Sequence, residues 1–449
     1  MGAGLTAAYA RFVADPQLES VPVEASELIR SGFVDLTATM IAGRNEPVVA
    51  ILHQHIRART GAAEASLLLA RERASSPDAA LLNATAGHAL DYDDVALSGH
   101  PSTVLVPAIL AEGERLRASG ADVIRAYLIG YEVWADLAAR ERDPYHEKGW
   151  HPTAVLGVVG AAAAVAHLAH LDAAHAQNAL GLAASMAAGL VANFGSMAKP
   201  FHAGRAASAA IEAARLAAAG MTSAPDAIEH RAGLLAALSP RGDVDRETPP
   251  AFGRELRLLK RRLSIKKYPA CYATHRVIDA VLDLAEKHRI DPGDVRAMTA
   301  TVGRTQASML RNHRPQTGLE AKFSLEFAAA APLVANRVGL AELQDDFVQQ
   351  PRVQQLLEKV SVRATDTRCA ADPLFAESDR VVIELRDGRK LDSGEVRFPR
   401  GHAELPLREE ELARKFFDCA RGAGGLDAER LYGRLRALHT VADVRELVS

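Results

Sequence analysis

Cysteine is scarce in this sequence, and neither sign of charge is in large excess. The 449 residues include only three cysteines, Cys271, Cys369 and Cys419, which lie far apart and form no CxxC pair. This spacing argues against a disulfide framework and a zinc ribbon, and it predicts a reducing, cytoplasmic compartment. The formal net charge is -3, from 53 Lys and Arg against 56 Asp and Glu. Because such a chain has no general attraction for nucleic acid or anionic lipid, we expect neither as a partner.

Long apolar runs and glycine-rich phosphate loops are also missing. The most apolar stretch, at 154–166, is a short run of mostly Ala, Gly and Val, whereas a membrane span needs about 20 strongly apolar residues. We therefore expect a buried helix whose small residues allow close backbone approach, and no membrane partner. The N-terminus has no basic stretch leading into an apolar segment, so no secretory signal is predicted. Neither a GxxxxGK loop nor a strand followed by GxGxxG occurs, which leaves nucleotide binding without support.

Helical patterning dominates the first half of the sequence. Ala and Leu are abundant, and apolar positions recur at intervals of three and four residues up to about residue 240. Clear examples are residues 121–141, 153–171 and 204–221. These segments predict the first part of a helical domain, over residues 1–265.

The pattern changes in the second half. β-branched residues at 295–304 predict a strand, and alternating apolar residues around Asp387-Gly388 predict a hairpin. Because helical stretches lie between them, residues 266–401 are expected to form an α+β lid domain. Helical patterning then returns, and residues 402–449 are expected to pack back on the first domain. The fold class is therefore predicted as mainly α, with a large all-helical domain formed by both chain ends and a smaller inserted lid; three domains in series is the alternative.

Carboxylates and a histidine crowd the segment HALDYDDVALSGHP, which contains Asp91, Asp93, Asp94 and His100. A calcium loop is excluded, because Ala96 occupies the position that needs glycine. If residues 85–95 are helical, Asp91 and Asp94 share one face and Asp93 faces elsewhere. The proline after His100 holds that histidine on a bent backbone beyond the helix. A helix end with solvated carboxylates is the structural alternative.

Two further clusters place basic residues beside prolines. In KGWHPTAV, His151 precedes a proline at which a helix is expected to begin. In GSMAKPFHAGRAA, Lys199 precedes a proline and is expected to be presented from a turn, with His202 and Arg205 in the next helical turn. Cations near a helix N-terminus suit a carboxylate ligand. A capping histidine and solubilising surface charge are the alternatives.

A fourth cluster, IKKYPACYATH, contains Lys267, Cys271 and His275. Cys271 and His275 have the i,i+4 spacing of a helical metal pair, but no companion motif supplies further ligands, so no metal is expected. Taken together, the four clusters suit proton abstraction next to a carboxylate. A base removes the α-proton, and fixed cations stabilise the negative charge that develops.

These four segments, in this order and over nearly the whole chain, resemble the MmgE/PrpD family, which includes 2-methylcitrate dehydratase, cis-aconitate decarboxylase and iminodisuccinate epimerase. The resemblance implies the same two-part fold, a homodimer, and catalysis without a metal or an organic cofactor. It implies active-site roles for Asp91, His100, Lys199 and His275, and a place facing the substrate for His151. From the same blocks we expect substrate binding by His202 and Lys267.

The expected function is that of a lyase acting on a small polycarboxylate. We expect abstraction of a proton alpha to a carboxylate of a di- or tricarboxylic acid, with dehydration of a hydroxy acid such as 2-methylcitrate as the leading reaction. Val95 departs from the pattern of the dehydratase and decarboxylase members, in which Thr follows the DxDD run, and its side chain cannot hydrogen-bond a substrate. The spacing to His100 is also about one residue shorter than in the decarboxylase pattern. Epimerisation of the iminodisuccinate type, decarboxylation of the cis-aconitate type and a non-catalytic binding protein are the alternatives.

Overall fold

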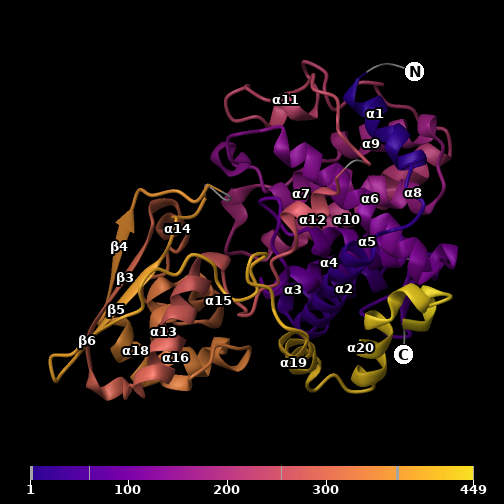
Figure 1. Ribbon diagram of the computed structural model, residues 1–449. Coiled ribbons are helices and arrows are strands. Elements are labelled where there is room, and N and C mark those ends of the chain that lie inside the picture. The colour runs from indigo at the N-terminus through magenta and orange to yellow at the C-terminus, as the bar shows by residue number, and fades with distance from the viewer. Residues whose placement is uncertain (1–3, 60, 254, 371–373, 448–449) are drawn as a thin grey trace. The chain divides into compact units, whose positions relative to one another are not determined.

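The chain forms two compact units (Figure 1). One combines residues 1–264 with residues 408–449, and the other comprises Ile265–Leu407. The structure is a computed structural model that describes residues 4–59, 61–253, 255–370 and 374–447. The prediction of a mainly α fold is confirmed, since strands occupy short stretches of the described chain.

The smaller unit differs slightly in extent from the predicted lid domain. It begins at Ile265 and ends at Leu407, whereas the sequence predicts residues 266–401. The additional C-terminal residues belong to a tight turn in which the Gly401 amide donates to the carbonyl of Leu405 at 2.8 Å. A Cβ atom at Gly401 would clash with the carbonyl of Ile265, so this turn packs closely on the start of the unit.

The larger unit is built almost entirely from helices. Its two short strands, β1 (Ala65–Ser66) and β2 (Arg73–Ala74), form an antiparallel pair. Among the described residues of this unit, the 3₁₀ segments are η1 (Tyr145–Lys148), η2 (Val191–Asn193), η6 (Leu438–Thr440) and η7 (Val444–Leu447). The α-helices are α1 (Leu5–Ala14), α2 (Val23–Gly43), α3 (Pro47–Arg57), α4 (Ser76–Ala89), α5 (Pro101–Leu116), α6 (Gly120–Ala139), α7 (Pro152–Val155), α8 (Gly157–Leu168), α9 (Ala173–Ser185), α10 (Ala198–Ala218), α11 (Leu234–Leu238), α12 (Arg257–Arg261), α19 (Glu409–Ala420) and α20 (Ala428–Arg436).

Small residues bring the core helices of this unit together. The predicted helix over 153–171 is divided into α7 and α8 at Leu156, but its expected burial and close approach are confirmed. A Cβ atom at Gly130 in α6 would lie 2.7 Å from the carbonyl oxygen of Gly160 in α8. Only glycine permits this contact, which locks α6 against α8.

Close helix packing at a glycine also sets the position of the predicted site residues. A Cβ atom at Gly204 in α10 would clash with the carbonyl of Leu81 and the hydroxyl of Thr85, both in α4. The two helices therefore pack with their backbones almost in contact. This packing places the first turn of α10 beside the C-terminal end of α4, where the predicted catalytic segment begins.

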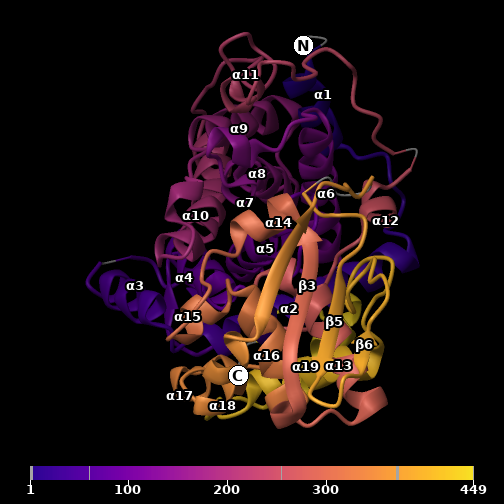
Figure 2. The ribbon, with the colours of Figure 1, turned by 90° about the vertical axis from the view of Figure 1, so that its left-hand side faces the viewer.

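The smaller unit is an α+β structure. Its sheet has the order β4-β3-β5-β6, as Figure 2 shows, with β3 parallel to β4 and antiparallel to β5. The predicted strand at 295–304 corresponds to β3 (Val295–Gly303), and the predicted hairpin to β5 (Arg380–Leu385) and β6 (Lys390–Asp392). The sequence analysis did not predict β4 (Val360–Thr365), whose side chains are half-buried or exposed.

Helices cover one face of this sheet. Contacts join α13 to β5 and α16 to both β3 and β4, while α18 packs on α16 (Figure 1). The helical segments of this unit are η3 (Tyr272–Thr274), α13 (His275–His288), η4 (Pro292–Asp294), α14 (Arg304–Met309), α15 (Gly318–Ala321), α16 (Leu325–Ala335), η5 (Ala341–Leu343), α17 (Asp345–Val348) and α18 (Pro351–Leu357). A single apolar core between sheet and helices stabilises the unit.

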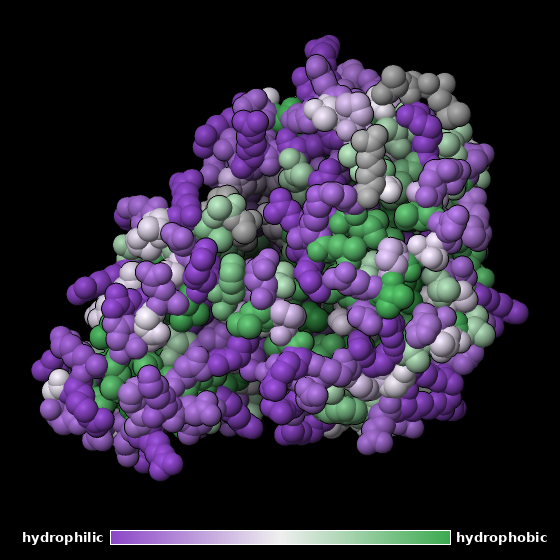
Figure 3. All heavy atoms as spheres, viewed as in Figure 1, coloured by the Kyte–Doolittle hydropathy of each residue, from purple (hydrophilic) through white to green (hydrophobic). Residues whose placement is uncertain are grey.

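The surface is predominantly polar. Hydrophilic side chains cover most of the face in Figure 3, with apolar residues gathered in smaller patches between them. Within the described ranges, every helix is too short or too polar to cross a membrane.

Candidate active site

The predicted catalytic segment is a loop between two helices of the larger unit. The predicted helix over 85–95 is wrong beyond Ala89, where α4 ends. Asp91 takes a left-handed backbone conformation with φ 51°, which cannot continue the helix. The prediction that proline holds His100 just outside a helix is confirmed, since α5 begins at Pro101. We call residues 90–100 the catalytic loop.

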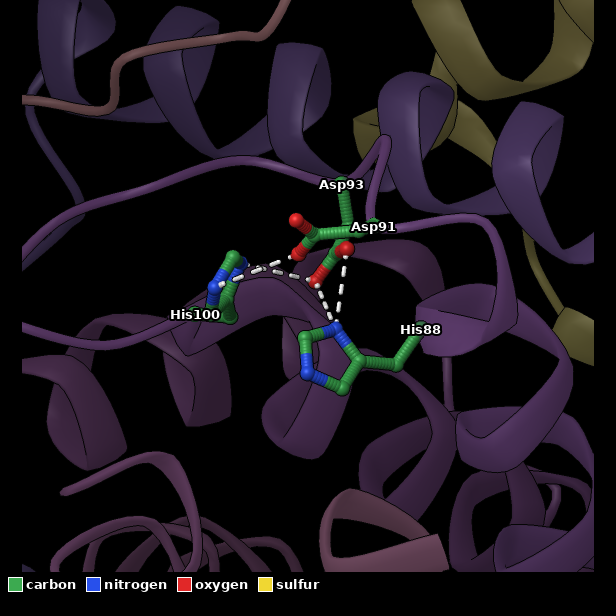
Figure 4. A group of neighbouring side chains, drawn as sticks. All are labelled: His88, Asp91, Asp93 and His100. Atoms are coloured by element: carbon green, nitrogen blue, oxygen red, sulfur yellow. Dashed lines mark hydrogen bonds and ion pairs between the residues drawn. The ribbon is translucent and has the colours of Figure 1, made fainter. Parts of the chain in front are cut away.

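Asp93 lies at the centre of this cluster, between two imidazole rings (Figure 4). Both of its carboxylate oxygens lie 3.0 Å from Nδ1 of His88, and Oδ2 lies 3.1 Å from Nδ1 of His100. The prediction that Asp93 faces away from the site is therefore wrong. It rested on helical geometry, which the chain abandons before Asp93.

The hydrogen bonds of His100 fix the position of its proton. Its Nδ1 lies 2.8 Å from the carbonyl oxygen of Asp94, which can only accept a hydrogen bond. Nδ1 therefore carries a hydrogen, and Nε2 is the nitrogen that can accept a proton. That Nε2 lies 3.9 Å from Oδ1 of Asp91, so the proton-accepting nitrogen is turned toward a second carboxylate (Figure 4).

Lys199 binds that second carboxylate. Its Nζ lies 2.6 Å from Oδ1 of Asp91, and both side chains are about nine-tenths buried. The prediction that Lys199 lies on a turn before the helix is wrong, because α10 already begins at Ala198. The following Pro200 is compatible with the first helical turn, where amide groups have no intrahelical acceptor.

A row of further imidazoles adjoins the ion pair. His151 is buried, its ring centroid is 5.9 Å from that of His88, and its Nδ1 lies 3.3 Å from Nδ1 of His202. Phe194 packs on the edge of His151 at 4.9 Å between centroids, and its ring lies 5.4 Å from Nζ of Lys199. His151 precedes the first residue of α7, as predicted.

Burial keeps several of these imidazoles neutral. It lowers the pKa of His88 to about 4, against the raising effect of the Asp93 carboxylate. Burial, and then the neighbouring His88 and Lys199, hold the pKa of His151 well below its usual range. The pKa of His202 is also lowered, by burial and by Lys199. Burial alone would raise the pKa of Asp93, but the two imidazoles outweigh it and hold that pKa well below its usual range.

Asp94 fastens the catalytic loop to the start of α5. It accepts hydrogen bonds from the amide of Ser102 at 3.2 Å and from the Ser102 hydroxyl. Burial, followed by the nearby Asp35 carboxylate, raises the pKa of Asp94 to about 8. Asp94 is therefore protonated at neutral pH, while Asp93 is ionised, although the two residues are adjacent in the sequence.

Four ligand atoms of this cluster lie within 4.8 Å of one another, one each from His88, Asp91, Asp93 and His100. Two imidazoles and two carboxylates match the donor types of zinc. However, Asp91 already pairs with the Lys199 ammonium group, and the imidazole Nδ1 hydrogens point at Asp93 and at a backbone carbonyl. A divalent ion would face this ammonium charge and would have to displace these bonds. The arrangement therefore fits proton transfer better than metal binding, and the absence of a metal stays a prediction.

Two predicted residues belong to the smaller unit. His275 is buried and begins α13, and its Nε2 donates to the carbonyl oxygen of Ala270 at 3.2 Å. Its ring centroid lies 5.2 Å from that of Tyr268 and 5.1 Å from that of Tyr272. Lys267 is half-buried. The roles expected for His275 and Lys267 stay predictions.

The site contains residues whose roles the sequence analysis missed. His88, Asp93 and Phe194 contact the predicted residues directly. His146 is half-buried. Burial, followed by the nearby Lys199 and His100, lowers its pKa to about 4. Their positions in the sequence could have identified both histidines, because His88 lies shortly before Asp91 and His146 lies shortly before His151. Arg205, predicted as a third cation, is exposed on α10.

Comparison with known proteins covers most of the chain. Residues 7–247 match the model of the MmgE/PrpD N-terminal domain, and residues 268–434 match that of the MmgE/PrpD C-terminal domain. The chain is 29% identical to cis-aconitate decarboxylase of Mus musculus over 351 residues, which cover 75% of this chain and 70% of that protein. Identity to the Homo sapiens decarboxylase is 28% over 352 residues, or 75% and 71% of the two chains.

A dehydratase is also similar, over a shorter region. The chain is 23% identical to 2-methylcitrate dehydratase of Salmonella typhimurium over 219 residues. This match covers 46% of this chain and 43% of the dehydratase. The similar proteins therefore include two lyase activities on small carboxylic acids.

Proposed function

Because this chain belongs to the MmgE/PrpD family, we propose that it is a lyase that removes a proton alpha to a carboxylate of a small di- or tricarboxylic acid. The leading reaction is dehydration of a hydroxy acid such as 2-methylcitrate. One observation carries this proposal: Nε2 of His100 faces a carboxylate that is bound to the buried ammonium group of Lys199. Base and cation are thus adjacent in a site that excludes most water.

His100 acts as the base in this proposal. Its Nε2 takes the proton of the carbon next to the substrate carboxylate, and the electron pair of the broken C–H bond moves toward that carboxylate. Asp93 stabilises the resulting imidazolium through the hydrogen on Nδ1, which an ionised carboxylate does well in a buried site. In dehydration, the C–O bond of the neighbouring carbon then breaks, and the hydroxyl leaves as water with a proton from an acid of the site.

Lys199 supplies the positive charge. In the free protein it is bound to Asp91. A substrate carboxylate that approaches Lys199 replaces or shares this partner, so the ammonium group faces the negative charge that develops as the α-proton leaves. Fixed cations aimed at such charge contribute most in a site of low effective dielectric constant.

Decarboxylation is the second candidate, because the similarity to cis-aconitate decarboxylases extends over more of the chain than the similarity to the dehydratase. There the C–C bond to a carboxylate breaks, carbon dioxide leaves, and the site returns a proton to carbon. Epimerisation shares the first proton transfer and ends with reprotonation on the opposite face. Val95, which offers no hydroxyl, is the residue that favours a substrate other than those of the dehydratases and the decarboxylases.

The proposal is tested by following three products from one panel of hydroxy acids, unsaturated tricarboxylates and amino-dicarboxylates. NMR in deuterated water detects α-proton exchange, absorbance detects the alkene, and a coupled assay detects carbon dioxide. Alkene formation supports dehydration, carbon dioxide supports decarboxylation, and exchange without either supports epimerisation. Binding without any exchange across the panel would instead support a non-catalytic binding protein.

Matched variants link the activity to the site. His100→Asn and Lys199→Met are expected to abolish the exchange. His175→Asn, which changes a histidine exposed on α9, and Lys260→Met, which changes a lysine 63% exposed, are the controls. Activity retained in His100→Asn would remove His100 from the mechanism.

We propose two further features that follow from the family. His275 serves as an additional acid or cation and Lys267 as a substrate contact, so His275→Asn should lower turnover and Lys267→Met should raise KM. The protein is expected to act as a cytoplasmic homodimer without a cofactor, and light scattering of the purified protein measures its oligomeric state.

A further inference from the structure

The catalytic loop is held in a conformation that its own sequence does not favour. Asp91, Leu97 and Ser98 all have positive φ angles, between 51° and 58°, although none is glycine. Such conformations cost energy and persist only where surrounding contacts maintain them. The loop carries both carboxylates of the proposed reaction, so contacts that maintain it also determine the geometry of the site.

Contacts within the first part of the chain hold the loop at Val95 and at His100. Val95 and Ser264 exchange backbone hydrogen bonds of 2.8 and 2.9 Å. The amide of His100 donates to the hydroxyl of Thr153 at 3.2 Å. Neither contact reaches the peptide between Asp91 and Asp93.

Lys415 reaches that peptide from the last part of the chain. Its Nζ donates to the carbonyl oxygen of Tyr92 at 2.7 Å and lies 3.9 Å from the centroid of the Tyr92 ring. The same ammonium group lies 2.5 Å from Oδ1 of Asp35 in α2. Lys415 is only 5% exposed, and it lies in α19, which packs on α2. One buried cation thus connects the core helix, the C-terminal helix and the middle of the catalytic loop.

We propose that Lys415 is a positioning residue for catalysis, which fixes the Tyr92–Asp93 peptide and thereby the relative orientation of the Asp91 and Asp93 carboxylates. The proposal rests on the proposed function of this site. Tyr92 lies between Asp91 and Asp93 in the sequence, so fixing its carbonyl group limits the movement of both carboxylates. Asp91 then stays paired with Lys199, and Asp93 stays between its two imidazoles. Lys415 itself touches no reacting atom in this proposal.

The test uses the full-length protein and separates the loop contact from the ion pair. Lys415→Met alone would leave Asp35 as a buried charge, so Asp35→Asn and the double variant Asp35→Asn/Lys415→Met are compared. The single variant keeps the lysine near Tyr92, whereas the double variant removes the loop contact without leaving an unpaired carboxylate. Arg414→Met, which changes an exposed neighbour in α19, is the control for the helix.

The expected result is a loss of turnover without a matching loss of binding. Relative to Asp35→Asn, the double variant should lose about tenfold or more in kcat while KM changes much less, because small misplacements of reacting groups cost rate. Hydrogen–deuterium exchange should become faster in residues 90–100 and stay unchanged in α6 and α8. Lys415→Arg should recover part of the kcat, since it keeps a buried cationic donor.

Two outcomes overturn the proposal. The first is a double variant with the kcat of Asp35→Asn, and the second is unchanged exchange in residues 90–100. If the double variant does not fold, as judged by circular dichroism, Lys415→Arg decides instead: a kcat below that of the wild type together with faster exchange in residues 90–100 supports the proposal, and a wild-type value of either one overturns it. Should the wild-type protein turn over no carboxylate, the proposed function fails, while the exchange measurement still tests whether Lys415 holds the loop.

Discussion

Two buried lysine–aspartate pairs contact the catalytic loop, and they differ in their surroundings. Lys199 and Asp91 keep 10% and 9% of their side-chain surface exposed, and imidazole and phenyl rings surround them. Lys415 and Asp35 keep 3% and 0%, and a backbone carbonyl takes another hydrogen of the lysine. The first pair keeps a small exposed surface, where we propose that a substrate carboxylate takes the place of Asp91, and the second is fully buried. A lysine–aspartate pair therefore suits exchange of the carboxylate partner at Lys199 and a fixed geometry at Lys415.

The largest effect that follows from this comparison concerns stability. Lys415→Met removes the buried ammonium partner of the Asp35 carboxylate, which should lower the free energy of unfolding by about 3–5 kcal/mol. Urea denaturation followed by circular dichroism measures the change. The double variant with Asp35→Asn should be more stable than Lys415→Met alone. If it is not, the pair does not act as a unit and the contrast with Lys199 is lost.

Lys199→Met should affect activity instead. Loss of a preorganised charge at the reacting centre is expected to lower kcat/KM roughly 10²- to 10³-fold. The loss of stability should be smaller than for Lys415→Met, because Asp91 retains some contact with solvent. Initial rates on the substrate panel and urea denaturation give the two values. Equal loss of stability in both variants would show that the first pair is also structural.

The histidines around the first pair make the protein sensitive to acid. An unfolded histidine titrates near 6.5, whereas the pKa values of His88 and His146 are about 4. Between these values the unfolded chain binds protons at these histidines that the folded protein does not, so their contribution to stability is full above pH 6.5 and falls as the pH approaches 4. The slope is about 1.4 kcal/mol per pH unit for each histidine.

His146→Gln isolates one of these contributions. Urea denaturation at several pH values between 4 and 6.5 should give a slope smaller by about 1.4 kcal/mol per pH unit than that of the wild type. The difference between variant and wild type cancels the contribution of Asp94, whose raised pKa acts in the opposite direction.

The smallest effect is expected at Val95, which lies in the catalytic loop but pairs with Ser264 through backbone atoms alone. Val95→Thr keeps the branched shape and both backbone bonds, so stability should change by about 1 kcal/mol or less. The added hydroxyl gives the site a new hydrogen-bonding group. The ratio of kcat/KM for hydroxy acids to that for other substrates should therefore rise, and an unchanged ratio would exclude Val95 from substrate selection.

Local signals in the sequence predicted the regular parts of the fold well. The Asp387-Gly388 turn joins β5 to β6, and Pro101 and Pro152 each begin a helix just after a histidine. These features depend on the backbone preferences of one or two residues. β4 was missed because half of its residues are exposed and its parallel partner, β3, is distant in the sequence.

The candidate site could be predicted in composition but less well in geometry. Asp91, His100, Lys199, His151 and His202 come together in the larger unit. The central position of Asp93 depends on the left-handed turn at Asp91, which only tertiary contacts stabilise. Lys415, 323 positions from Tyr92, carries no motif at all. Contacts of this range leave no local pattern, so the sequence gives no sign of them.

The interruption of the larger unit by residues 265–407 has a consequence during synthesis. A ribosome adds about 5–20 residues per second, so the 143 inserted residues delay the C-terminal helices by about 7–29 s. Throughout this interval the apolar side of α2 lacks α19, and Asp35 lacks its lysine. The nascent polypeptide thus exposes an apolar surface that a chaperone can bind until residues 408–449 have been made.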